Sequence, residues 1–476
     1  MPDRGTGLRA VGGNELWRET ATALATLIRL RELSAAEVVR AHLDRIDAVN
    51  PELNAIITLD REGALAAADE ADRLLSRGGP TGPLHGLPIA VKDLEDTAGM
   101  RTTYGSPLFR DHVPSADTLL VTRLRSAGAI IIGKTNTPEF GAGSQTFNAV
   151  FGATRNPYDR SRTPGGSSGG AAAAVASGML PLADASDLGG SIRNPAAFCG
   201  LVGLRPSPGR IAEVPTTNPW SPLSVHGPIA RTVEDAALLL RALCGPDPRA
   251  PLSLVDPPEA FADVGPADLG AVRIAWSDNL GGLPVEPEVT EVLRRRRVEL
   301  EALGCTIEDA EPDLSGADEA FETLRAVGFA HEFGELVRTR RDQLKDTVVW
   351  NTEVGLALTG EQIGRAFALQ SEAFARMRDL LERYDALALP VTQVAPFDVD
   401  EPWPREVAGV SMRSYLEWMR ACSRITVTAH PAISVPAGFT DDGLPVGLQL
   451  VGRHRGEAAL LRLAAAAHPG WRAPAG

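Results

Sequence analysis

The spacing of apolar residues changes along the chain, from a helical pattern to alternating strands and helices. Within residues 14–75, Ser34 and Glu37 form an S-x-x-E capping box ahead of the run VVRAHLDRIDAV, and REGALAAADEADRLLSR predicts a second helix. From about residue 80 to 210, short apolar runs such as GLPIAVKDL alternate with glycine-rich turns and small-residue helices. This alternation is typical of an α/β sheet with helices on both faces.

The second half of the chain returns to strands only near its end. TVEDAALLLRALCG predicts a helix that ends at Gly245, and a Pro-rich connection follows it. AVRIAWS predicts a strand, and residues 286–384 are mostly helical. DALALPV, PAISVPAG and PVGLQLVG predict three more strands before a final helix, EAALLRLAAAA.

Core strands at both ends of the sequence favour one folding unit over several. We predict a single α/β domain over residues 1–476, with a central mixed sheet flanked by helices on both faces. Its parts are N-terminal helices at 14–75, a glycine- and serine-rich core at 76–245, a helical insertion at 250–385, and strands with a final helix at 386–470.

Composition excludes several classes of partner. The net charge of -14 argues against nucleic acid and anionic membranes, which attract Lys and Arg. No run approaches a membrane span, and MPDRGTGLRAVGGNELWRET lacks the apolar core of a signal peptide, so we expect a cytoplasmic protein. The four cysteines have no CxxC spacing, which predicts reduced core residues and no zinc site. They are Cys199, Cys244, Cys305 and Cys422.

Three short motifs match known patterns but fit them poorly. GAIIIGKT at 128–135 has the Walker A spacing, yet its β-branched residues favour a strand over a phosphate loop. HEFGE at 331–335 lacks the second histidine of a zinc motif and favours a solvated helix surface. GGSSG at 165–169 has the G-x-S-x-G spacing of an α/β-hydrolase, with His430 or His454 as the base, but no strand leads into it. A nucleotide-binding protein and a His-dependent esterase therefore stay open as alternatives.

Lysine is rare in this chain. Of 47 Lys and Arg residues only three are lysine, namely Lys92, Lys134 and Lys345. A chain biased to arginine keeps lysine where arginine cannot substitute, and one such task is to lose a proton. Lys345, in the polar run RTRRDQLKD, is interpreted as a surface residue.

Three segments place a polar side chain beside a strand or a glycine loop. They are GLPIAVKDL with Lys92, TPGGSSGG with Ser167, and SDLGGSIRNPAAFCG with Ser191. Gly189 and Gly190 precede Ser191, so backbone N–H groups lie unobstructed beside its hydroxyl. Such donors suit an oxyanion hole.

The stretch from Gly165 to Gly209 resembles the signature of the amidase signature enzymes, and the likeness extends to GLPIAVKD, GKTNTPEFG, GPIARTVEDAALLL and GLPVGLQLVG. The resemblance implies a Ser-cisSer-Lys triad in which Ser191 is the nucleophile, Ser167 the bridge and Lys92 the base. It implies an oxyanion hole from the backbone of residues 188–191, and a substrate-side position for the helical insertion. The oxyanion donors are Leu188, Gly189, Gly190 and Ser191, and the supporting residues are Asp187, Arg193 and Ser168.

The resemblance implies hydrolysis of small amides, with esters and carbamates as further substrates, and no cofactor or metal. Aromatic residues near the expected cleft favour a hydrophobic or aryl group, and a homodimer is compatible with this function. The segment VPTTNPWSPLSVHGPIART lacks the S-L-D-Q-I-G-P stretch of subunits that amidate charged tRNA, so a freestanding enzyme is favoured over that alternative. The residues expected at the substrate are Tyr104, Phe140, Gly141, Ala142, Gly143, Phe147 and Trp220.

Overall fold

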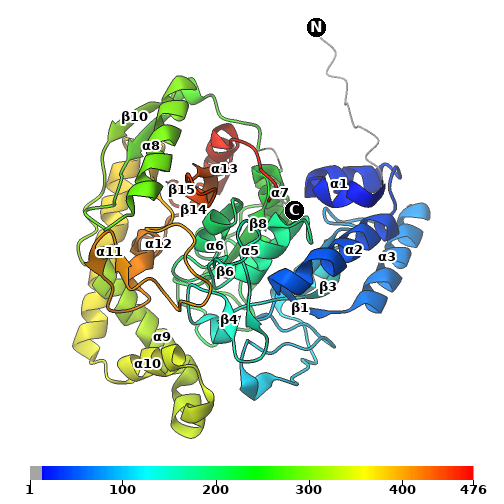
Figure 1. The fold of residues 1–476 in the computed structure, drawn as a ribbon, viewed down its shortest axis with the longest axis horizontal. Helices are drawn as coiled ribbons and strands as arrows, with labels where there is room; N and C mark the ends of the chain where they lie inside the picture. Colours follow the sequence, from blue (N-terminus) through cyan, green and yellow to red (C-terminus); the bar gives the residue numbers. More distant parts are fainter. Residues whose placement is uncertain (1–12, 263, 475–476) are drawn as a thin grey trace.

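The computed structural model describes residues 13–262 and 264–474, and its centre is an eight-stranded mixed sheet (Figure 1). Its strands are β6 (Leu182–Asp187), β7 (Val202–Arg205), β8 (Val225–Ala230), β9 (Arg273–Trp276), β10 (Thr306–Asp309), β11 (Ala386–Pro390), β14 (Ala432–Phe439) and β15 (Pro445–Val451). Their order is β10-β9-β11-β15-β14-β7-β8-β6. β10, β9 and β11 are parallel, and the other neighbours are antiparallel. The predicted α/β fold with a mixed sheet is confirmed.

A second, three-stranded sheet carries the lysine of the candidate site. It consists of β1 (Ile56–Leu59), β2 (Pro88–Lys92) and β3 (Ile130–Thr135), with β3 in the middle. β3 is the Walker-like segment, and all its residues are buried. Lys134 in it donates to Thr97 Oγ1 at 3.0 Å and Thr102 Oγ1 at 3.2 Å. The segment is a core strand with no phosphate loop, so the nucleotide-binding interpretation of this motif is wrong.

Helices at the N-terminal end form one flank of the molecule (Figure 1). They are α1 (Ala21–Arg29), α2 (Ala35–Leu53) and α3 (Arg61–Ser76). The capping box that starts α2 is present: Ser34 Oγ accepts from the Glu37 N–H at 3.1 Å, and the Glu37 carboxylate accepts from the Ser34 N–H at 2.8 Å.

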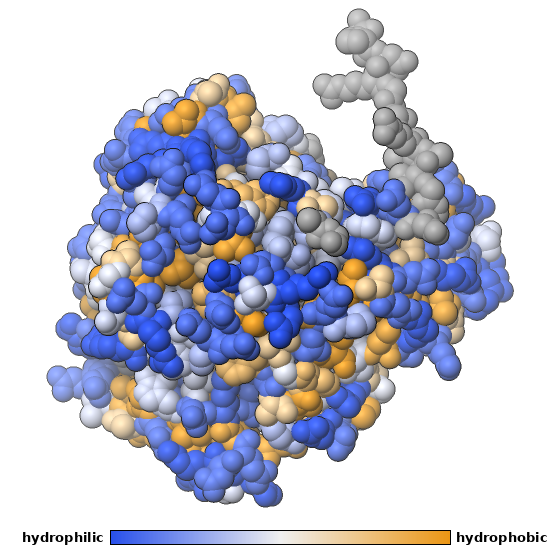
Figure 2. Space-filling view, viewed as in Figure 1, coloured by the Kyte–Doolittle hydropathy of each residue, from blue (hydrophilic) through white to orange (hydrophobic). Residues whose placement is uncertain are grey.

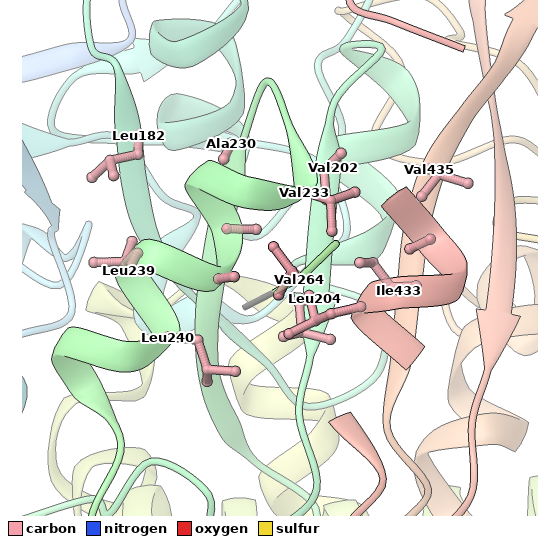
Figure 3. Close-up of a cluster of buried hydrophobic side chains, with 14 of the residues drawn as sticks. Leu182, Val202, Leu204, Ala230, Val233, Leu239, Leu240, Val264, Ile433 and Val435 are labelled. Carbon is pink, nitrogen blue, oxygen red and sulfur yellow. The ribbon is translucent and has the colours of Figure 1, made fainter. Parts of the chain in front are cut away.

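The eight-stranded sheet is covered on both faces. Figure 3 shows apolar side chains of β6, β7, β8 and β14 packed against α7 on one face. Alternation along β14 sends Ile433 and Val435 to this face. On the other face, Gly203 of β7 lies so close to α6 that an added Cβ would come within 2.6 Å of Ala196 Cβ. The helices around the core are α4 (Leu119–Ser126), α5 (Gly169–Ala176), α6 (Arg193–Phe198), α7 (Val233–Leu243) and α13 (Glu457–Ala467).

The middle of the chain forms the opposite flank (Figure 1). Its helices are α8 (Pro287–Ala302), α9 (Ala317–Arg340), α10 (Asp346–Leu356), α11 (Gly360–Leu381) and, further along, α12 (Arg420–Val427). Two small hairpins are β4 (Phe147–Asn148) with β5 (Gly152–Ala153), and β12 (Glu406–Val407) with β13 (Val410–Ser411). The 3-10 helices are Gly13–Arg18, Pro107–Phe109, Glu139–Gly141, Pro258–Phe261, Leu269–Ala271, Arg341–Gln343 and Glu417–Met419.

Polar residues dominate the face seen in Figure 2, and exposed apolar side chains are scattered over it. Within the described residues, no helix is long and apolar enough to cross a membrane. The four cysteines are buried and free, as predicted. Residues 1–12, on which the expectation about a signal peptide also rests, lie outside the described residues.

We predict that Glu457→Ala lowers the free energy of unfolding by about 3 kcal/mol, because it leaves a buried cation short of a partner. Glu457 is fully buried at the start of α13, accepts from the Ser207 N–H at 2.7 Å and pairs with Arg210 Nη2 at 2.8 Å. Urea unfolding measures the loss. The exposed Glu291→Ala on α8 is the control, at about 0.5 kcal/mol, and an equal effect of the two changes would contradict the prediction.

Candidate active site

Three segments far apart in the chain meet at one cavity of about 500 Å³. Lys92 is the last residue of β2, Ser167 lies just before α5, and Ser191 lies in the loop between β6 and α6. Ser167, Ser186 and Ser191 line the cavity. The structure thus brings the three predicted segments together.

The Lys92 amine is fully buried and surrounded by serine hydroxyls. Its Nζ lies 2.8 Å from Ser167 Oγ, 2.8 Å from Ser168 Oγ and 2.9 Å from Ser186 Oγ. Burial lowers the pKa of Lys92 from 10.5 to about 7, against the opposing effect of Asp184 and other nearby carboxylates. The amine can therefore be neutral at physiological pH. Ser186 is a contact that the sequence did not reveal.

Small residues allow this arrangement. All eight residues of α5 are Gly, Ala or Val, and all are buried. A Cβ on Gly170 would come within 2.3 Å of the Asn136 backbone N, so only glycine lets the helix start this close to the loop after β3. The peptide bond from Gly166 to Ser167 is cis.

A buried charge network holds the loop that carries Ser191. Asp187 accepts from Arg193 Nη2 at 2.9 Å, and Arg205 Nη1 lies 3.3 Å from the same carboxylate oxygen. Burial opposes the ionisation of Asp187, but Arg193 and Arg205 outweigh it and hold its pKa well below the usual range. Asp187 and Arg193 thus lie where supporting residues were expected.

The Asp187 carboxylate also accepts a hydrogen bond from one of the backbone N–H groups that were expected to form the oxyanion hole. The Gly190 N–H donates to Asp187 Oδ1 at 2.8 Å, so in this structure it is engaged within the loop. The backbone of Gly190 has φ +125°, which favours glycine. A Cβ on Gly189 would come within 2.6 Å of Phe321 Cζ and 2.7 Å of Met419 Cε, so these two side chains leave little room for any residue but glycine at this position.

Aromatic side chains form an apolar wall of the cavity. Tyr104 and Phe140 line it as expected, and the ring of Phe140 lies 4.8 Å from that of Phe333 on α9. Phe147 and Trp220 are not among the lining residues, and Trp220 is 70% exposed. The other apolar lining residues are Leu94, Leu120, Leu188, Ala212, Val214, Pro215, Leu223, Leu324, Phe329, Tyr415 and Met419.

Lys345 holds the loop expected at the substrate, residues 141–143, in place from the side away from the cavity. Gly141 and Gly143 line the cavity, whereas Ala142 is buried and turns its carbonyl toward Lys345. Lys345 Nζ donates to that carbonyl at 3.2 Å, and Thr347 Oγ1 donates to it at 3.3 Å. Lys345 is half-buried, which corrects its interpretation as a surface residue. It was missed because its partner lies 203 positions away in the chain.

The histidine-based alternatives find no support in the geometry. His430 Nδ1 contacts the Thr428 carbonyl at 2.7 Å and its ring packs on His454 and Phe374, so this pair belongs to a separate cluster that does not line the cavity. His331 and Glu332 of the HEFGE motif lie on α9 and line the cavity. Among the described residues, no group of three His, Cys, Asp or Glu could hold a metal ion.

Comparison with known proteins identifies the family. The family model described as Amidase matches residues 37–461. An acylamidase of Rhodococcus erythropolis is 39% identical over 449 residues, which is 94% of each chain. A glutamyl-tRNA(Gln) amidotransferase subunit of Acidothermus cellulolyticus is 37% identical over 96% of this chain and 95% of its own. The chain belongs to the amidase signature family, whose members hydrolyse amide C–N bonds.

Solved structures agree with this assignment. A bacterial aryl acylamidase of the amidase signature family has a TM-score of 0.89 and 28% identity, over 94% of this chain and 95% of its own. A 6-aminohexanoate cyclic dimer hydrolase in complex with its substrate has a TM-score of 0.86 and 30% identity, over 97% and 99% of the two chains. The fold and the amidase class predicted from the sequence are thereby confirmed.

We predict that Lys345→Met raises KM about three- to tenfold and changes kcat less, because the loop at 139–144 would lose one of the bonds that fix it beside Ser167. Steady-state hydrolysis of a 4-nitroanilide separates the two constants.

Lys345→Arg keeps a donor and should restore much of the KM, which a loss of packing alone would not do. Asp342→Asn, an exposed change in the neighbouring turn, is the control. A parent-like KM in Lys345→Met at unchanged thermal stability would contradict the positioning role.

Proposed function

We propose that this amidase hydrolyses small amides with Ser191 as nucleophile, Ser167 as proton bridge and Lys92 as base. The observation that carries the proposal is the buried Lys92 amine, 2.8 Å from Ser167 Oγ beside a cavity that Ser191 lines. Ser191 Oγ bonds to the amide carbonyl carbon while its proton passes through Ser167 to Lys92. The ammonium returns the proton to the leaving amine, and water then hydrolyses the acyl ester.

The proton relay requires the Ser191 side chain to rotate toward Ser167. Among the described residues, no hydrogen bond joins Ser191 Oγ to Ser167 Oγ, although both side chains line the cavity. A serine hydroxyl has three staggered positions, and catalytic hydrogen bonds often tighten only when substrate is bound. Substrate binding therefore completes the relay in this proposal.

The oxyanion is assigned to the backbone beside the nucleophile. Because the Gly190 N–H is engaged by Asp187, the proposal rests on the N–H groups of Leu188, Gly189 and Ser191. Within the described part of the chain, the Gly189 and Ser191 N–H groups donate to no protein acceptor. Rigid donors of this kind stabilise the developing negative oxygen.

The aromatic wall favours an apolar or aryl group on the substrate. Tyr104, Phe140, Phe329 and Phe333 line the cavity, and aromatic surfaces bind such groups by burying apolar area. Relatives named acylamidase and aryl acylamidase support this substrate class. Esters and carbamates pass through the same tetrahedral oxyanion, so they are proposed as further substrates.

A subunit that works on charged tRNA is the second candidate, because relatives with that name are 37% identical. The segment around Trp220, VPTTNPWSPLSVHGPIART, lacks the S-L-D-Q-I-G-P stretch expected of such subunits. We therefore propose that the chain acts alone, and hydrolysis of a nitroanilide by the isolated protein distinguishes the two.

A reactive fluorophosphonate should label the protein once, on Ser191, because only an activated serine attacks the phosphorus at an appreciable rate. Peptide mass mapping locates the adduct. Lys92→Met and Ser167→Ala should slow labelling by at least about 100-fold, since each removes the acceptor or the bridge for the proton.

Ser76→Ala, which removes an exposed hydroxyl at the end of α3, is the matched control and should label like the parent. Circular dichroism of each variant shows that the fold is intact. An adduct on Ser167, or parent-like labelling of Lys92→Met, would overturn the assigned roles.

We predict that kcat/KM for a 4-nitroanilide rises with pH and levels off about one unit above the Lys92 pKa of about 7, because only the neutral amine accepts the proton. Below pH 7 the rate should fall about tenfold per unit. Lys92→Arg should lose at least about 10³-fold at every pH, since the guanidinium does not deprotonate. A flat profile from about pH 6 to about pH 8 would contradict Lys92 as the base.

A further inference from the structure

Carboxylates gather on one side of the cavity, apart from the triad. Glu95, Asp96, Glu213 and Glu332 all line it. Two of them have protein donors: Tyr104 OH donates to Asp96, and Thr118 Oγ1 donates to Glu95 at 3.1 Å. Within the described part of the chain, no hydrogen-bond donor of the protein contacts Glu213 or Glu332, so the oxygens of these two carboxylates are free to accept from a ligand.

Glu213 and Glu332 line the same cavity from two different elements. Glu213 lies in the loop between β7 and β8, and its side chain is 42% exposed, whereas Glu332 is an exposed residue of α9. Burial and then the charge of Glu213 raise the pKa of Glu332, against the opposing effect of His331. Among the described residues, neither carboxylate forms an ion pair with Lys or Arg, and the basic group beside Glu213 is His226, whose Nε2 lies 3.9 Å from it. We call these two residues the carboxylate pair.

An independent feature lies beside the carboxylate pair. His226 lines the cavity, is only 5% exposed, and has no hydrogen-bond partner for Nδ1. Its Nε2 is 3.9 Å from Glu213, beyond hydrogen-bond distance, and its Nδ1 is 3.7 Å from Glu95. Burial lowers the pKa of His226, but Glu95 and Glu213 outweigh it and raise this pKa. The ring is therefore a polar group held between two carboxylates, with one nitrogen left without a hydrogen bond.

Helix α9 forms one wall of the cavity, and the chemical character of this wall changes along the helix axis. Arg325, Phe329 and Glu332, spaced four and three residues apart, line the cavity from one face of the helix. Arg325 is buried and donates hydrogen bonds to the neutral side chains of Asn351 and Tyr415. At 1.5 Å per residue, Glu332 lies about 10 Å further along the helix. The wall thus runs from a buried, hydrogen-bonded guanidinium, past an aromatic ring, to a carboxylate.

We propose that the carboxylate pair, with His226 beside it, binds an ammonium group carried by the amide substrate at the end remote from the scissile bond. This inference rests on the proposed function and narrows its substrate class to amides with a positive charge beyond an apolar segment. Two carboxylates provide the charge, and Phe329 provides a ring face that also attracts a cation.

The test compares two acyl groups of equal shape. 5-Aminopentanoyl 4-nitroanilide carries an ammonium group where hexanoyl 4-nitroanilide carries a methyl group. At about pH 8 the aliphatic amine of the substrate is protonated. We expect the cationic substrate to have the higher kcat/KM by about tenfold, and the ratio to shrink as salt is raised from about 20 mM to 0.5 M.

Variants locate the preference. Glu213→Gln and Glu332→Gln should each reduce the ratio about three- to fivefold, and the double variant should abolish it, while the neutral substrate is cleaved as by the parent. Glu335→Gln is the matched control: it makes the same change one turn along α9, and Glu335 does not line the cavity. 5-Aminopentanamide and hexanamide, used as competitors of fluorophosphonate labelling, give a second readout that requires no turnover.

Each outcome decides one of the two proposals. Equal kcat/KM and equal competition by the two acyl groups, or a preference that survives in the double variant, would overturn the carboxylate pair as an ammonium site and leave the amidase mechanism standing. Failure of fluorophosphonate to label Ser191 in the parent protein would instead overturn the proposed function, and with it this inference.

Discussion

The structure depends on burying one lysine amine among serine hydroxyls. A protonated amine donates three hydrogen bonds, and a neutral amine donates two and accepts one. The three hydroxyls around Lys92 can meet both demands, because each rotates to donate or accept. Burying this amine lowers the stability of the fold. Between about pH 7 and 10.5 Lys92 is protonated in the unfolded chain and neutral in the folded chain, so the free energy of unfolding rises with pH across this window. Below about pH 7 Lys92 is charged in both states, and folding buries that charge.

Arginine residues occupy positions that need a permanent charge, whereas the three lysines lie around one cavity. Arg193 stays cationic beside Asp187 and fixes the loop of the nucleophile. Lys134, by contrast, donates to the Glu95 carbonyl behind the cavity wall, and Lys345 donates to the Ala142 carbonyl behind the substrate loop. A compact ammonium on a flexible chain reaches the Glu95 carbonyl in the buried space around Lys134, where a planar guanidinium needs more room. The scarcity of lysine in the sequence therefore pointed to the right region, although the sequence alone identified a role for Lys92 only.

Sequence patterns predicted the structural features that depend on residues close together in the chain. The capping box at Ser34, the strands and the glycine-rich segments of the site follow from neighbouring residues, and so do the positions of Lys92, Ser167 and Ser191. Contacts across the chain could not be predicted in this way. Lys345 sits in a polar run that is typical of a surface, and only the packing of α10 against the loop at 139–144 reveals its partner. The Gly190 N–H was assigned to the oxyanion because the sequence does not show that Asp187 already accepts from it.

Reaction and specificity come from different parts of the fold. The candidate triad lies on the second sheet and on the loops before α5 and α6, where small residues and a buried ion network allow little movement. The outer wall comes from α9, which contributes Arg325, Phe329 and Glu332 to the cavity. Because the tetrahedral oxyanion is common to amides, esters and carbamates, the triad by itself cannot select among them. In the proposed function, selection between substrates comes from groups that the substrate meets far from its reacting carbon, and such groups line the cavity along α9 from Arg325 to Glu332.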